Sequence, residues 1–134
     1  MRKLNWFKAG AMAYMLLGAL HLVSQTSKSG LSENVLQTFA EMKATTFNFM
    51  GQHDLMQFYT GFSITMGFML FAFGLQAFLI KYPTLSVYIA NAIVSIIASV
   101  LAILYFHPLA WSFLLFATLS FTIGAVSAKK QGVA

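Results

Sequence analysis

Residues 55–80 read LMQFYTGFSITMGFMLFAFGLQAFLI and contain no Asp, Glu, Lys or Arg. The uncharged stretch begins after Asp54 and ends at Lys81. A helix needs about 20 mostly apolar residues to cross the hydrocarbon core of a bilayer. The segment therefore predicts a transmembrane helix and makes lipid the expected surroundings of the chain.

The composition supports a membrane protein. Of its 134 residues, 59% are hydrophobic and 8% are charged, whereas a soluble domain carries about 25% charged residues. The formal charge of +5 comes from basic residues that flank apolar spans, so we expect membrane lipid and no nucleic acid as partner. The chain has no cysteine, which excludes disulfides and thiolate metal ligands.

Four apolar stretches are each about long enough to span, and none has the strict alternation of a barrel strand. They lie at about 6–25, 55–80, 84–106 and 109–128. The connections Lys81–Pro83 and His107–Pro108 are short, so neighbouring helices should run antiparallel. We predict an all-α, antiparallel four-helix transmembrane bundle that forms a single domain over residues 1–134.

The long connection between the first two spans has a pattern of its own at about residues 32–44. Apolar side chains recur there at helical spacing, and polar ones occupy another face: Leu31, Val35, Phe39 and Met42 against Glu33, Gln37 and Glu41. We expect an amphipathic helix, which either lies on the outer membrane surface or caps the bundle.

The distribution of lysine and arginine predicts the orientation. An even number of spans places most basic residues on one face: Arg2, Lys3, Lys8, Lys81, Lys129 and Lys130. The opposite face has only Lys28 and Lys43, so the positive-inside rule puts both termini in the cytoplasm. We expect the first helix to be retained rather than cleaved as a signal peptide, because the cleavage motif after it is weak.

The three histidines are the main candidates for a site. In this topology His21, His53 and His107 all fall at the outer face. Imidazole with carboxylate suits zinc, iron or copper, so one hypothesis is a metal or haem site formed by these residues. The alternative is interfacial histidines with local hydrogen bonds, since their spacing matches no metal-binding motif.

Further polar candidates lie at the start of the second span or in the inner half of the second and third spans: Asp54, Gln57, Tyr59, Gln76 and Asn91. Gln76 and Asn91 are predicted at similar depth on neighbouring helices, where they would form a structural clasp or contact a substrate. Tyr59 and Gln57 begin the second span beside His53, where a lipid or quinone would enter from the outer leaflet.

Several short motifs resemble those of a known group of proteins. The motifs are Gly18-Ala19-Leu20-His21, Met50-Gly51 and Phe58-Tyr59-Thr60-Gly61-Phe62-Ser63. They are similar to a group of small, uncharacterised four-helix membrane proteins of spirochaetes and Bacteroidetes, with a looser likeness to DoxX-like architecture. That group has an aromatic and an acidic residue where this chain has Met56 and Gln57, so no functional carboxylate is carried over. The resemblance implies this fold and a bacterial inner (cytoplasmic) membrane, and it implies no activity.

Function is less well defined by the sequence. Apart from Lys8 at the start of the first span, the spans contain no charged residue, unlike those of most pumps. The chain also has no nucleophile elbow and no phosphate-binding glycine loop. We therefore expect a non-enzymatic accessory or interaction subunit, as a homo-oligomer or within a larger membrane complex. Two alternatives stay open: a metal- or haem-binding redox module at the outer face, and a lipid- or quinone-interacting membrane enzyme.

Overall fold

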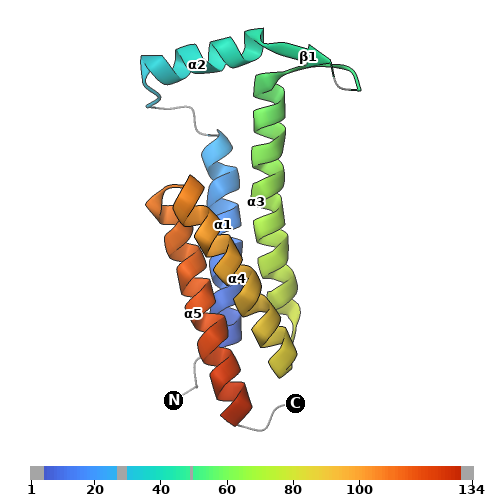
Figure 1. Cartoon of the computed structure of the whole chain (residues 1–134), viewed down its shortest axis with the longest axis vertical. Helices are drawn as coiled ribbons and strands as arrows, with labels where there is room; N and C mark the ends of the chain where they lie inside the picture. The colour runs from blue at the N-terminus through green and yellow to red at the C-terminus, as the bar shows by residue number, and fades with distance from the viewer. Residues whose placement is uncertain (1–4, 27–29, 49, 131–134) are drawn as a thin grey trace.

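Four long helices pack antiparallel in the computed structural model, which describes residues 5–26, 30–48 and 50–130 (Figure 1). They are α1 (Trp6–Thr26), α3 (Leu55–Leu79), α4 (Leu85–Tyr105) and α5 (Pro108–Lys130). Each is long and apolar enough to cross a membrane. The predicted all-α, four-span bundle is therefore confirmed. Of the basic residues used to predict the orientation, Arg2, Lys3 and Lys28 lie outside the described residues.

The short connections end and restart the helices as their prolines suggest. Proline lacks the backbone N–H that a helix interior needs, so it is found at helix starts and in turns. Pro108 is the first residue of α5, directly after His107 in the turn. Pro83 precedes Thr84, whose hydroxyl accepts a hydrogen bond from the Val87 amide and caps α4.

Helix α1 is the centre of the bundle, because it packs against both α3 and α5, while α4 packs mainly against α5. Glycines let α1 and α3 approach closely. A Cβ atom built on Gly18 would lie 2.5 Å from the Phe71 amide nitrogen, and one on Gly74 would lie 2.6 Å from that of Met15. These two glycines thus serve contacts within the chain, as close helix packing in membranes requires.

A hydrogen-bonded network joins α1, α4 and α5 inside the bundle. The Tyr14 hydroxyl donates to Ser95 Oγ at 3.0 Å, and Ser95 Oγ donates to the Asn91 carbonyl at 2.7 Å. Ser99 Oγ donates to the Ser95 carbonyl at 2.7 Å and lies 3.2 Å from Thr118 Oγ1. Hydroxyls buried away from water need such partners, so the network satisfies groups that would otherwise destabilise the core.

Between α1 and α3 the chain forms helix α2 (Glu33–Ala44) and a hairpin of β1 (Thr46–Asn48) and β2 (Gln52–Asp54). Helix α2 crosses the end of the bundle at a large angle to α3 (Figure 1). The predicted amphipathic helix is confirmed. The hairpin was not predicted, because strands of three residues are too short to show a period of two.

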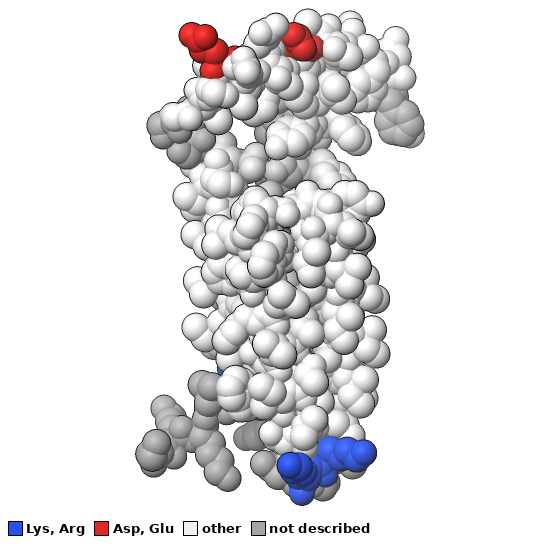
Figure 2. All heavy atoms as spheres, turned by 60° about the vertical axis from the view of Figure 1, so that its left-hand side comes forward, with Lys and Arg blue, Asp and Glu red and all other residues white. Residues whose placement is uncertain are grey.

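The two ends of the bundle carry opposite charge. Figure 2 shows basic side chains at one end, acidic ones at the other, and a broad uncharged band between them on this face. We call the end with Lys8, Lys81, Lys129 and Lys130 the lysine end, and the end with α2 and the hairpin the hairpin end. Together with the four apolar helices, this arrangement is that of a small polytopic membrane protein.

Candidate functional site

A cavity of about 440 Å³ lies at the hairpin end, bounded by α1, α3 and the turn that joins α4 to α5. Its polar lining residues are His21, Ser24, Gln25, Tyr59, Ser63 and His107. The remainder is apolar: Leu17, Leu20, Phe62, Met66, Phe106, Leu109 and Ala110. Within the described chain, no Asp, Glu, Lys or Arg lines this cavity. Its chemistry is therefore that of hydroxyl, amide and imidazole groups beside aromatic and aliphatic side chains.

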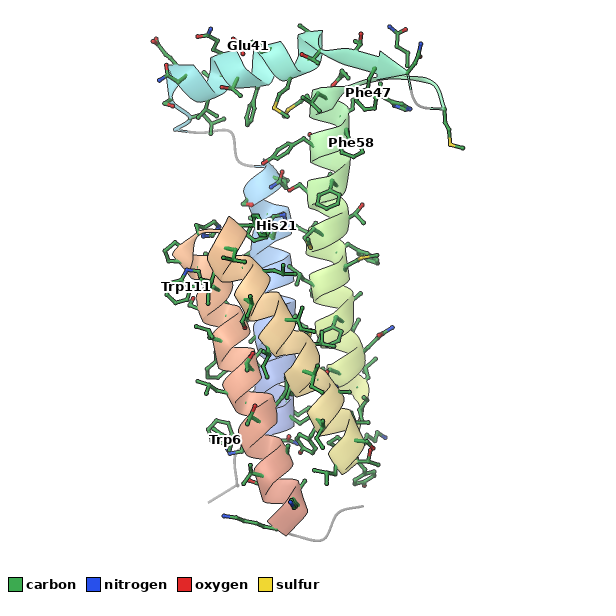
Figure 3. The ribbon with its side chains drawn as sticks, viewed as in Figure 1. Trp6, His21, Glu41, Phe47, Phe58 and Trp111 are labelled. Atoms are coloured by element: carbon green, nitrogen blue, oxygen red, sulfur yellow. The ribbon has the colours of Figure 1, made fainter. Side chains whose placement is uncertain are left out.

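His21 is held on the wall of the cavity by α3. Its Nε2 lies 2.9 Å from Ser63 Oγ and 3.1 Å from the Ser63 carbonyl oxygen. The imidazole rests against Gly67, where a Cβ atom would lie 2.9 Å from His21 Cδ2. A side chain at position 67 would therefore displace the ring, so glycine and serine on α3 together position His21 (Figure 3).

The tautomer of His21 decides the direction of its hydrogen bonds. A protonated Nε2 donates to the Ser63 oxygens, whereas an unprotonated Nε2 accepts from the Ser63 hydroxyl. Within the described residues, Nδ1 has no hydrogen-bond partner. In either tautomer, Nδ1 therefore offers a ligand the complementary role, as a donor to a carbonyl or an acceptor from a hydroxyl.

Two more predicted candidates share this cavity with His21. Tyr59 lies one helical turn before Ser63 on α3 and is 47% exposed. His107 lies exposed in the turn before Pro108. Ser63 was not predicted as a site residue, although its position four residues after Tyr59 places both on one face of α3. Ser24 and Gln25 were also missed, because the end of a span offers no distinctive pattern.

His53 lies apart from the other two histidines. It lines a separate pocket of about 190 Å³ with Phe47, Gln57 and Phe58, and it pairs with Phe47 across the hairpin. In the described part of the chain, no group of three His, Cys, Asp or Glu residues is close enough to hold a metal ion. The structure thus brings His21 and His107 to one cavity and does not bring His53 to them.

Asp54 and Gln57 start helix α3. The backbone N–H of Gln57 donates to Asp54 Oδ1 at 2.7 Å, and the backbone N–H of Asp54 donates to Gln57 Oε1 at 3.4 Å. This reciprocal arrangement is a capping box, which satisfies backbone donors that have no partner within the helix. An Asp followed three residues later by Gln, just before an apolar run, is the sequence signal that identifies it.

Gln76 and Asn91 do not line the cavity. The Asn91 side-chain amide donates to the Val87 carbonyl at 2.8 Å, within its own helix, and Gln76 is exposed. No hydrogen bond between Gln76 and Asn91 is present among the described residues. The bond from Tyr14 to Ser95 instead links polar groups of different helices at this level.

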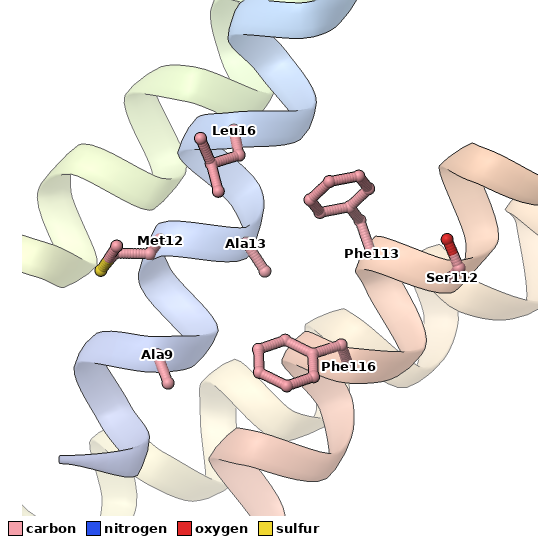
Figure 4. Close-up of a pocket in the computed structure, with 7 residues that line it drawn as sticks. All are labelled: Ala9, Met12, Ala13, Leu16, Ser112, Phe113 and Phe116. Carbon is pink, nitrogen blue, oxygen red and sulfur yellow. The ribbon is translucent and has the colours of Figure 1, made fainter. Parts of the chain in front are cut away.

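A second hollow, of about 460 Å³, is an open groove between α1 and α5. Figure 4 shows Phe113 and Phe116 of α5 reaching toward Ala9 and Ala13 of α1. Among the described residues that line it, Ser112 alone has a hydroxyl, which already donates to the Leu109 carbonyl at 2.9 Å. The groove therefore offers apolar contact and little hydrogen-bonding chemistry.

Comparisons with known proteins identify no family. A scan against protein-family models, a search of curated proteins and a search of solved structures each gave no match. The resemblance to small four-helix bacterial membrane proteins therefore stays a prediction. The cavity at the hairpin end has to be interpreted from its own geometry and chemistry.

Proposed function

We propose that the protein is a non-enzymatic accessory protein of the membrane that binds the polar head of an uncharged amphiphile in its hairpin-end cavity. The observation that carries the proposal is that His21, Tyr59 and His107 share one otherwise largely apolar cavity. Ligand sites in proteins are typically cavities of about 300–1,000 Å³ with a few polar groups that fix orientation. This cavity has that size and that lining.

The lining favours a ligand head without charge. Phosphate groups are usually bound by Arg or Lys, and neither type lines the cavity in the described chain. A quinone fits the groups that are present, because its carbonyl oxygens accept hydrogen bonds from a tyrosine hydroxyl or an imidazole N–H. Its ring would contact Phe62 and Phe106. The proposed class is therefore quinones, with neutral lipids such as diacylglycerol as the nearest competitor.

The position of the cavity suits an amphiphile that stays in the membrane. The lining residues come from the second half of α1, the first half of α3, the turn after α4 and the first turn of α5. They lie near the edge of the apolar band, where polar heads meet hydrocarbon. The aliphatic residues Leu17 and Met66 lie deeper along their helices than His21 and Tyr59, so the tail would point toward the bilayer centre.

The two tryptophans allow a binding measurement with an internal control. Trp111 directly follows the lining residue Ala110, whereas Trp6 lies at the lysine end (Figure 3). We expect a short-chain quinone, added to the protein in lipid nanodiscs, to quench Trp111 in the Trp6→Phe variant saturably. Trp6 in the Trp111→Phe variant should show only the weak, linear quenching of a probe dissolved in lipid.

Matched variants identify the residues involved. Tyr59→Phe removes one hydroxyl from the cavity. It should weaken quinone binding about fivefold, which is the loss of affinity expected when one hydrogen bond is removed. Tyr105→Phe removes an exposed hydroxyl at the same end without touching the lining and should bind normally. In the same way, His107→Gln in the cavity should weaken quinone binding, whereas the control His53→Gln, outside the cavity, should bind normally. Unchanged binding in both cavity variants, or equal quenching of both tryptophans, would contradict the proposal.

The accessory role itself is tested by co-purification in mild detergent. Gly18, Gly67 and Gly74 lie against the neighbouring helix of the α1–α3 pair. Ser95 and Ser99 contact Tyr14 of α1 and Thr118 of α5, so these small residues are not left free for a partner. The open groove between α1 and α5 is the better-placed surface for a helix of another copy or of a larger complex. A clean monomer that captures no other membrane protein would count against an accessory role and would leave the cavity proposal intact.

A further inference from the structure

The segment between α1 and α3 has an apolar side of its own, which the cavity does not use. On α2 the half-buried residues are Val35, Phe39 and Met42, with Leu31 just before the helix, while the polar residues Glu33, Gln37 and Glu41 are exposed. The main contacts of α2 are with α3 and β2, so the half-buried side is the side that faces the bundle. We call this side, together with Phe47, the underside.

The hairpin continues the underside toward α3. Phe47 pairs with His53 across the hairpin, and its ring meets that of Phe58 edge-on at 6.0 Å between centroids. In Figure 3, Phe47 lies on the side of the strand that faces the first turn of α3. Phe58 is 61% exposed and begins the lipid-facing surface of α3. The underside therefore runs into that surface without an intervening charge.

The length of α3 places this segment at the membrane surface. Helix α3 has 25 residues, which is about 37 Å at 1.5 Å per residue. The hydrocarbon core is about 30 Å thick, and each headgroup layer adds about 5–7 Å. With its lysine end at one edge of the hydrocarbon, α3 reaches about 7 Å beyond the other edge. Its first turn, and α2 beside it, then lie in the headgroup layer.

We propose that α2 and the hairpin dock on the lipid surface at the hairpin end, with the underside inserted among the headgroups. Interfacial helices bind in this way when an apolar face meets the boundary between headgroups and acyl chains. The exposed charges of the segment are Glu33, Glu41 and Lys43, which give no excess of positive charge to attract anionic lipid. Docking should therefore be apolar and independent of lipid charge.

The absence of cysteine makes this proposal directly testable, because single cysteines can be labelled without background. A bimane fluorophore is placed at Val35→Cys on the underside and at Gln37→Cys on the opposite face of α2. A second pair, Met42→Cys and Ala40→Cys, guards against failure of one variant to fold. The proteins are reconstituted in phosphatidylcholine nanodiscs that contain lipid with a nitroxide at carbon 5 of one acyl chain.

We expect the nitroxide lipid to quench the underside probes at least about twofold more than their partners, as insertion at the acyl boundary requires. Aqueous iodide should quench the partner probes more than the underside probes. Replacing half of the lipid with phosphatidylglycerol should change neither result. Underside probes shielded from both quenchers would show that the segment packs on protein, and the proposal would fail. Equal lipid quenching of both faces, or quenching that depends on anionic lipid, would overturn it as well.

Discussion

His21 on α1 and Ser63 on α3 form a polar contact within a membrane helix pair, with Nε2 of the imidazole 2.9 Å from the serine hydroxyl. Ser63 is buried and His21 is half-buried. The contact lies one turn from Gly67, which provides the space that the ring occupies. It fixes the orientation of the one predicted histidine that belongs to both a transmembrane helix and the cavity.

We predict that Ser63→Ala lowers the free energy of unfolding by about 0.6 kcal/mol, the average of side-chain hydrogen bonds in membrane helices. The loss is small because the Ser63 carbonyl oxygen remains 3.1 Å from Nε2 as an alternative acceptor. Reversible unfolding in detergent measures it, with Thr65→Ala on the exposed face of α3 as the control. A double-mutant cycle with His21→Ala should show coupling, and its absence would mean that the contact contributes nothing.

The glycines of α3 should differ sharply in their tolerance of alanine. At Gly74 the added methyl group would lie 2.6 Å from the Met15 amide nitrogen and 2.7 Å from the Ala11 carbonyl oxygen. Backbone atoms cannot move aside cheaply, so we expect Gly74→Ala to destabilise the protein by about 1–3 kcal/mol. Gly61 has open space around it, so Gly61→Ala should be neutral or stabilising by up to about 1 kcal/mol. Similar unfolding energies for the two variants would disprove the close α1–α3 contact.

Two buried serines should respond to alanine with opposite sign. Ser95 accepts a hydrogen bond from Tyr14 and donates one to the Asn91 carbonyl, so Ser95→Ala leaves the buried Tyr14 hydroxyl unpaired. We expect a loss of about 1–3 kcal/mol. Ser120 Oγ is buried without a partner among the described residues, so Ser120→Ala removes an unsatisfied group and should gain about 1 kcal/mol. Unfolding of both variants under identical conditions tests the contrast, which a destabilised Ser120→Ala would contradict.

The fold followed from the sequence because lipid imposes simple requirements on a spanning chain. Length, the absence of charge and the prolines at the turns were enough to define α3, α4 and α5 to within two residues. The neighbours of each helix were not predictable in the same way. Packing of α1 between α3 and α5 depends on which small residues meet, and Gly18, Gly67 and Gly74 reveal their roles only when the two helices are in register.

The site was harder to predict, because polar residues at the ends of spans have several uses. Asp54 and Gln57 were candidates for chemistry, yet they cap α3. His53 was grouped with the other histidines by its end of the bundle, but the unpredicted hairpin pairs it with Phe47. His21 and Tyr59 lie on different spans, so only the side-by-side packing of α1 and α3 brings them to one cavity.

The orientation of the bundle in the membrane is a prediction that single cysteines can test. Lys81, Lys129 and Lys130 lie at the lysine end with Lys8, whose ammonium group contacts the Phe78 and Ile80 carbonyls at the end of α3. The positive-inside rule therefore predicts that the lysine end faces the cytoplasm. In intact cells, a membrane-impermeant maleimide should label Gln52→Cys on the hairpin and should label Tyr82→Cys only after permeabilisation.

Both positions are exposed, so access to reagent depends on the side of the membrane and not on burial within the protein. Replacing Lys81, Lys129 and Lys130 with Gln should produce a mixed population in which a fraction of Tyr82→Cys becomes reactive from outside, because the charge bias sets the orientation. Lys8 is kept in that variant, since its contacts with the end of α3 would add a folding defect to the change in charge. If Tyr82→Cys were labelled in intact cells with all lysines present, the orientation would be the opposite of the predicted one. That result would also place the His21 cavity and the lipid-docking segment at the cytoplasmic face.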